Sequence, residues 1–122
     1  MNLTTSLACL LAVSSTIFAA EPAPEKITHT FFIAGGETAI LSNDGKPHWN
    51  DPAATRDGFV LPNGNLLLAL SKNKDYPGGA VVEVTRENTV VFEFKGTQSE
   101  VNTAQLLPNG NIMLTEAGAK PR

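Results

Sequence analysis

The chain has 122 residues, a formal net charge of −3 and one cysteine. This length allows one small domain or a part of a larger one. The acidic balance and the absence of a basic stripe exclude an ordinary nucleic-acid surface, and a single cysteine excludes a disulfide framework.

Residues 1–20 are typical of a secretory signal peptide. They contain no charged side chain, and their apolar run is too short to span a bilayer. We expect cleavage near Ala19 or Ala20, a secreted or periplasmic protein, and no membrane contact after cleavage. A retained anchor is the alternative. Residues 21–26 would then form a short linker before the folded part, which we expect over 27–122.

Short β-strands are predicted from residue 27 onward, because apolar runs or apolar–polar alternation lie between Gly, Pro and Asn. The first three predicted strands cover 27–34, 38–42 and 46–50. The segment 35–50 aligns with 78–93 at an offset of 43 residues, so these strands correspond to the last three of a four-stranded unit.

A complete four-stranded unit follows at 55–94. Its predicted strands are 55–61, 66–70, 80–85 and 90–94. Asn63-Gly64 and Glu87-Asn88 supply residues that tolerate positive φ, so tight turns join the strands into an antiparallel meander.

A further unit begins at Val101 and continues through a strand at 112–115. The pentapeptide LPNGN occurs at 61–65 and again at 107–111, each time before an apolar strand. We interpret the repeat as a hairpin turn of the scaffold rather than as a ligand-binding loop.

The side-chain pattern predicts a sheet that is covered on both sides. Val82 and Val84 alternate with Val81, and we expect Val90 to share one face with the aromatic residues that follow it. A four-stranded unit of about 40–45 residues is the period of a β-propeller blade. We therefore predict an all-β fold, a partial propeller of about two and a half blades. A plain β-sandwich is the alternative.

The units resemble blades of the quinoprotein-like and arylsulfotransferase-like propeller family. The matching residues are AILSNDGKPHW at 39–49 and the LPNGN segments, and the resemblance covers roughly 27–116. The family includes enzymes, assembly scaffolds and binding platforms. Glu87-Asn88 and Phe92 depart from the Gly and Trp of the family pattern, so no pyrroloquinoline quinone or other cofactor is predicted.

Propellers close with about four to eight blades. If the four strands of a blade are lettered A to D in chain order, we expect an incomplete set, with strands B-C-D at 27–50, a full blade at 55–94 and strands A-B at 101–116. The chain is therefore interpreted as an N-terminal fragment whose partners include the remaining blades of a longer protein.

Candidate binding residues lie where the first strands of successive units begin, next to the expected central channel. They are Arg56, Asp57, Glu100 and Asn102. An alternative is that Arg56 and Asp57 form an ion pair between units. The loop at 71–79 adds further candidates for an anionic or sugar-like ligand, with solvated side chains as the alternative: Lys72, Lys74 and Tyr76.

No catalytic set can be identified. His29 and His48 lack partners at the spacing of a known motif, and no metal-ligand cluster is predicted. We expect a secreted binding or interaction scaffold for a small molecule, a sugar or a protein. The alternative is a propeller enzyme of the quinoprotein-like or arylsulfotransferase-like type whose catalytic residues lie in other blades, and so the sequence leans against enzyme activity in this chain without deciding it.

Overall fold

The structure is a computed structural model that describes residues 29–119 of the chain. This part contains nine β-strands and no helix, which confirms the all-β prediction. The strands are β1 Phe31–Ile33, β2 Thr38–Leu41, β3 Pro47–Asp51, β4 Thr55–Val60, β5 Leu66–Leu70, β6 Ala80–Val84, β7 Val90–Lys95, β8 Glu100–Leu106 and β9 Ile112–Ala117. The predicted signal peptide at 1–20, the linker at 21–26 and the first two residues of the strand predicted at 27–34 lie outside the described residues.

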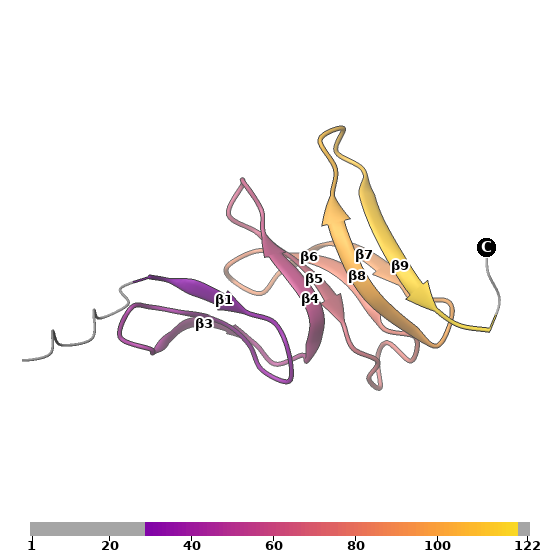
Figure 1. Cartoon of the computed structure of the whole chain (residues 1–122), viewed down its shortest axis with the longest axis horizontal. Coiled ribbons are helices and arrows are strands. Elements are labelled where there is room, and N and C mark those ends of the chain that lie inside the picture. Colours follow the sequence, from indigo (N-terminus) through magenta and orange to yellow (C-terminus); the bar gives the residue numbers. More distant parts are fainter. Residues whose placement is uncertain (1–28, 120–122) are drawn as a thin grey trace, which may run out of the picture.

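The strands form three antiparallel sheets in chain order. The first sheet has the order β1-β2-β3, the central sheet β4-β5-β6-β7 and the third sheet β8-β9. The predicted four-stranded meander is therefore confirmed, and its strands begin at the predicted residues. Figure 1 shows the three sheets side by side in a row, with the central sheet between the other two.

Each tight turn has positive φ at its second predicted residue, whereas Asn63 and Asn109 do not adopt positive φ. Gly64 and Gly110, at matching positions of the two LPNGN segments, have φ values of 88° and 83°. In both turns the glycine N–H donates to the carbonyl oxygen of the leading leucine, at 2.9 Å. Asn88 has a φ of 59° and is the one described non-glycine residue at positive φ. An Asn-Gly hairpin thus explains each LPNGN segment.

Strands β5 and β6 of the central sheet are covered on both faces, whereas β7 is mostly exposed. Strand β5 is buried along its whole length. Leu66, Leu68 and Leu70 pack with Ile40 and Trp49 of the first sheet. The intervening residues Leu67 and Ala69 join a second cluster with Val101 and Ala104 of the third sheet. This packing confirms the predicted coverage of both faces for β5 and β6 but not for β7.

The first sheet also contacts the central sheet at a glycine. A methyl group at Gly58 in β4 would lie 2.7 Å from the Cε1 ring carbon of Phe32. Since real side chains do not approach so closely, the ring occupies the space that a larger residue at 58 would need. Phe32 packs against the same cluster as Ile40 and Trp49.

Four β-bulges recur at equivalent positions, with one extra residue in each. Arg56 is the extra residue of β4 and Asn102 that of β8. His48 is the extra residue of β3 and Val91 that of β7. Arg56 and Asn102 are 46 residues apart, and His48 and Val91 are 43 apart. The bulges therefore recur at the same offsets as the sequence repeats.

The bulge in β7 corrects one expectation. Alternation predicted that Val90 shares a face with Phe92 and Phe94. The register places Val90 opposite Val84, which packs toward the first sheet, whereas Phe94 lies opposite Val81, which packs toward the third. The extra residue at 91 reverses the alternation, because the side-chain period in a strand is two.

Candidate binding surface

The candidate channel residues gather where β4 and β8 begin. The Arg56 guanidinium donates to the Glu100 carboxylate and forms an ion pair with it. One residue further along β4, the Asp57 carboxylate accepts a hydrogen bond from the Thr103 hydroxyl of β8. The other oxygen of that carboxylate, Oδ1, accepts from the backbone N–H of Gly58 at 2.9 Å.

The bulges aim two of these side chains away from the ladder. An extra residue in a strand turns its side chain out of the regular alternation. Arg56 and Asn102 both occupy this place and both are exposed. The side chains of Arg56 and Glu100 are 42% and 20% exposed, so the pair remains open to a solute. We call Arg56, Asp57, Glu100, Asn102 and Thr103 the polar strip.

The charge of the polar strip limits what it can bind. It contains one guanidinium against two carboxylates, and the guanidinium already has a carboxylate partner. An anion would have to displace Glu100 and would meet Asp57 nearby. A neutral molecule that offers hydroxyl groups can donate to the carboxylates and accept from the Asn102 amide without that cost.

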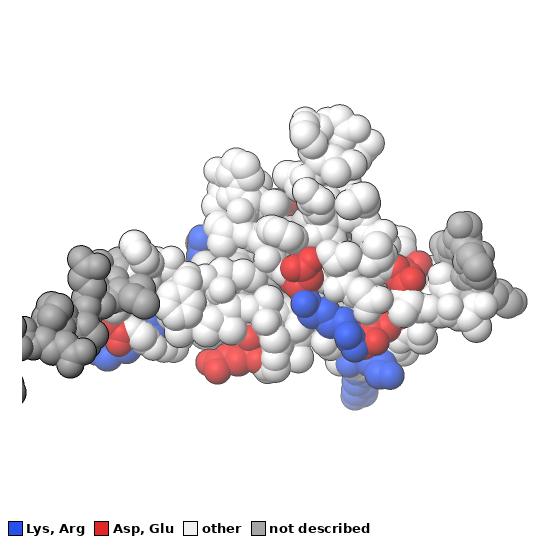
Figure 2. Space-filling model, viewed as in Figure 1, with Lys and Arg blue, Asp and Glu red and all other residues white. Residues whose placement is uncertain are grey.

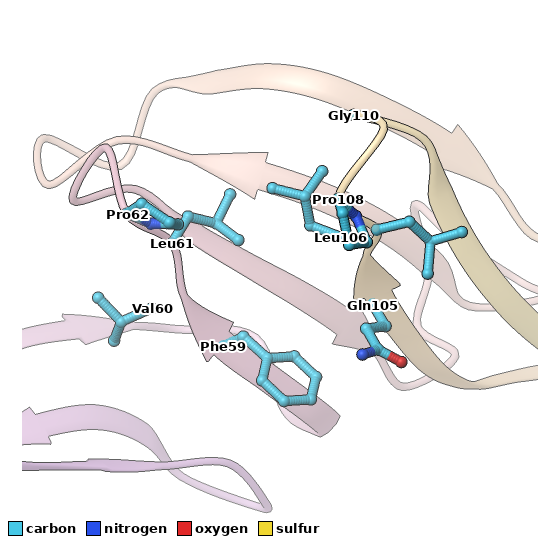
Figure 3. A pocket seen from close by; sticks show the side chains of 9 residues that line it. Phe59, Val60, Leu61, Pro62, Gln105, Leu106, Pro108 and Gly110 are labelled. Carbon is cyan, nitrogen blue, oxygen red and sulfur yellow. The ribbon is translucent and has the colours of Figure 1, made fainter.

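An apolar pocket of about 570 Å³ lies at the other end of the same two strands. Matching residues of the two repeats contribute in pairs. The lining is Phe59, Val60, Leu61, Pro62, Gln105, Leu106, Leu107, Pro108 and Gly110. Figure 3 shows the Phe59 ring and the Gln105 side chain on neighbouring strands, with Pro62 and Pro108 further along them. Phe59 is 43% exposed, so its ring can contact a ligand.

The surface around this pocket carries little charge. Figure 2 shows the two projecting hairpin tips almost free of charged side chains, whereas acidic and basic groups gather in the lower half of the view. The nearest residues of the polar strip and the apolar pocket are two residues apart along each strand, Asp57 to Phe59 and Thr103 to Gln105, or about 7 Å at 3.3 Å per residue. A ligand of disaccharide size could contact both.

The loop candidates line a separate cavity of about 370 Å³ between residues 52–54 and 70–76. Lys72 and Lys74 are exposed there. The Tyr76 hydroxyl is already engaged, because it donates to Glu93 Oε1 at 2.6 Å. This hydrogen bond, partial burial and the negative charges of Glu93 and Asp75 raise the pKa of Tyr76 to about 12. The Lys95 ammonium lies 5.7 Å from the ring centroid.

The structure thus brings the four predicted channel residues together and places the three loop candidates in another cavity. The predicted alternative of an ion pair between units holds for Arg56, whose partner is Glu100, whereas Asp57 is hydrogen-bonded to Thr103. Sequence reasoning missed the apolar pocket. Phe59-Val60-Leu61-Pro62 and Gln105-Leu106-Leu107-Pro108 recur at the LPNGN offset, and this signal could have indicated a paired wall.

The two histidines are apart from this surface. His29 is exposed before β1, and His48 is exposed at the β3 bulge. Across residues 29–119, no group of three or more His, Cys, Asp or Glu side chains could hold a metal ion. Over the same residues, no helix has the length and apolarity needed to cross a membrane.

Comparisons with protein-family models, with curated proteins and with solved structures find no match to this chain.

Proposed function

We propose that the three sheets are consecutive blades of a β-propeller, over 27–50, 55–94 and 101–116, in a secreted or periplasmic protein. Three observations support the proposal: meanders in chain order, face-to-face packing of successive sheets, and bulges at the same repeat positions. In this arrangement β4 and β8 would be innermost strands of adjacent blades. A β-sandwich does not need any of the repeated bulges.

In this proposal the protein is a binding scaffold, and its ligand lies along β4 and β8. The observation that carries it is the pairing of equivalent residues across the two strands, with Asp57 beside Thr103 and the apolar pocket between the two Leu-Pro steps. Binding sites combine an apolar wall with a few convergent polar groups, and these strands supply both.

We propose a neutral, hydroxyl-rich ligand such as a short oligosaccharide. The Asn102 amide and the two carboxylates can exchange hydrogen bonds with hydroxyl groups. The exposed ring of Phe59 offers a flat apolar surface for the C–H face of a sugar. Paired charges disfavour an anion at the polar strip.

The test is an NMR titration of the full chain with neutral disaccharides, using a hexose phosphate as the charged comparison. We expect amide shifts confined to 56–62 and 100–108, and weaker shifts with the phosphate. Phe59→Ala should abolish them, whereas Phe31→Ala, which removes a ring 49% exposed on the first sheet, should not. Shifts confined to 71–76, or none at about 10 mM sugar (a Kd far weaker than 1 mM), would contradict the proposed site.

A further inference from the structure

A groove of about 690 Å³ runs between β9 and the outer half of the central sheet. Phe92 and Phe94 of β7 form one wall, and Ile112 and Leu114 of β9 form the other. Among the described strands, β9 has one hydrogen-bonded neighbour, β8, so its other edge pairs with none of them. Backbone groups on such an edge can pair with an added strand.

The molecule contains an occupied counterpart of this groove. Trp49 in β3 occupies the repeat position of Phe92 in β7, 43 residues earlier. Trp49 is only 7% exposed because residues of β5 and β6 pack against it, whereas Phe92 is 38% exposed. Strand β9 matches β5 at the offset of 46 residues. Strand β6 therefore helps to cover Trp49. No described strand takes the equivalent place over Phe92.

Strand β6 defines the chemistry of the occupant. It runs antiparallel to β5 and packs Ala80, Val82 and Val84 toward the first sheet. A strand in the same relation to β9 needs small or β-branched apolar residues at alternate positions. Glu83 lines the groove, but its carboxylate already accepts from the Asn63 and Asn65 amides, at 3.1 and 2.6 Å. Apart from Asn111, the other side chains that line the groove are apolar.

We propose that this groove binds an extended segment of a partner polypeptide, which adds antiparallel to β9 and places alternate apolar side chains over Phe92 and Phe94. Main-chain hydrogen bonds to the strand edge supply affinity, and the apolar wall selects the alternating pattern. The inference rests on the repeat correspondence of the sheets and is independent of any ligand at the polar strip.

The experiment uses the full chain and a fluorescent synthetic peptide with the sequence of residues 78–85, GGAVVEVT, followed by two lysines for solubility. Anisotropy measures binding, and hydrogen exchange maps the site. We expect saturable binding and slower exchange of the amides at 112–115. A control peptide with lysine in place of the residues corresponding to Ala80, Val82 and Val84 should not bind.

Two matched pairs of variants locate the peptide. Leu114→Lys and Phe92→Lys place a charge in the groove and should weaken binding by about tenfold or more, the usual cost of losing a buried anchor. Met113→Lys and Val91→Lys change exposed neighbours that do not line the groove, 50% and 56% exposed, and should leave affinity within about twofold. Circular dichroism shows which variants are folded. If one groove variant fails to fold, the other groove variant and its control are enough to test the site.

Three outcomes would overturn the proposal. One is the absence of binding at about 1 mM peptide, which would mean a binding free energy weaker than about 4 kcal/mol. Another is binding that both groove variants leave intact. The third is protection of 112–115 that grows with protein concentration alone and that the peptide does not displace, since a second copy would then occupy the groove. Sugar titrations at the polar strip are unaffected by any of these results.

Discussion

Thr103 and Asp57 occupy the same position in two successive repeats, and the hydroxyl of the first donates to the carboxylate of the second. The residues are 46 apart in sequence. Their contact means that β4 and β8 lie alongside each other in matching register. One side-chain hydrogen bond therefore reports how two neighbouring sheets are aligned.

Removing this hydrogen bond should weaken the interface between the central and third sheets. Thr103→Val keeps the shape of the side chain but leaves the half-buried Asp57 carboxylate without its hydroxyl donor. We expect a loss of about 1–3 kcal/mol in the free energy of unfolding, measured by urea denaturation. Thr103→Ser retains the donor and should lose much less. Equal losses for the two variants would show that the methyl group, and not the hydroxyl, stabilises the contact.

The need for glycine in the LPNGN turn should come from its backbone conformation alone. No atom lies within 4 Å of a methyl group placed at Gly64, yet its φ is 88°. Gly64→Ala should therefore cost about 1–2 kcal/mol through strain without any clash, and thermal denaturation would measure it. Gly36 is equally open but not at positive φ, so Gly36→Ala should change stability by less than about 0.5 kcal/mol. A neutral Gly64→Ala would refute the turn assignment.

The Tyr76 phenol should titrate late. It is the only tyrosine in the chain, so absorbance at high pH reports it alone. We expect a pKa of about 12, against 10.0 for an ordinary tyrosine, mainly because the hydroxyl donates to Glu93. Glu93→Gln should bring the pKa back toward its usual value. Unchanged titration in this variant would mean that burial, and not Glu93, causes the shift.

The same pKa shift predicts the direction of a pH effect on stability. Folding favours the protonated phenol, so its contribution is complete below the pKa of the unfolded chain, about 10. The contribution should decline as pH rises from about 10 toward the folded-state pKa of about 12. Tyr76→Phe should remove this part of the decline in chemical denaturation, because phenylalanine does not titrate.

Substitutions at Phe32 and Gly58 should have coupled effects on stability, because the two residues are in contact. Gly58→Ala places a methyl group where the ring lies and should destabilise the chain by about 1–3 kcal/mol. Phe32→Leu alone loses packing, but in the double variant the smaller side chain should recover part of the Gly58→Ala loss. A double-mutant cycle in thermal denaturation measures this coupling, and strictly additive losses would exclude direct contact.

Most of the strand pattern could be predicted from the sequence, because alternation and Asn-Gly turns are local signals. The four predicted strands of the central sheet agree with the observed ones, and positive φ occurs at Gly64 and Asn88. The polar strip was also located, since the first strands of successive units were expected to converge near Arg56 and Glu100.

The bulges could not be predicted, because one extra residue leaves no mark on composition. At β7 the bulge moved Val90 to the opposite face from Phe92. At β4 and β8 it turns Arg56 and Asn102 away from the ladder. The apolar pocket was missed for another reason: Leu61 and Pro62 were interpreted only as part of a turn, although a wall between two strands depends on how the sheets pack.

The burial of β5 on both sides has a consequence for cooperativity. Within residues 29–119, one buried cluster joins the first sheet to the central sheet and another joins the central sheet to the third, so stability divides into terms for single sheets and for these two interfaces. Structure should then be lost from the outer sheets inward, and amides in 66–70 should exchange last. A destabilising change confined to the first sheet would lower the free energy of unfolding of the central sheet through the interface that the two share. It would leave the third sheet nearly unaffected.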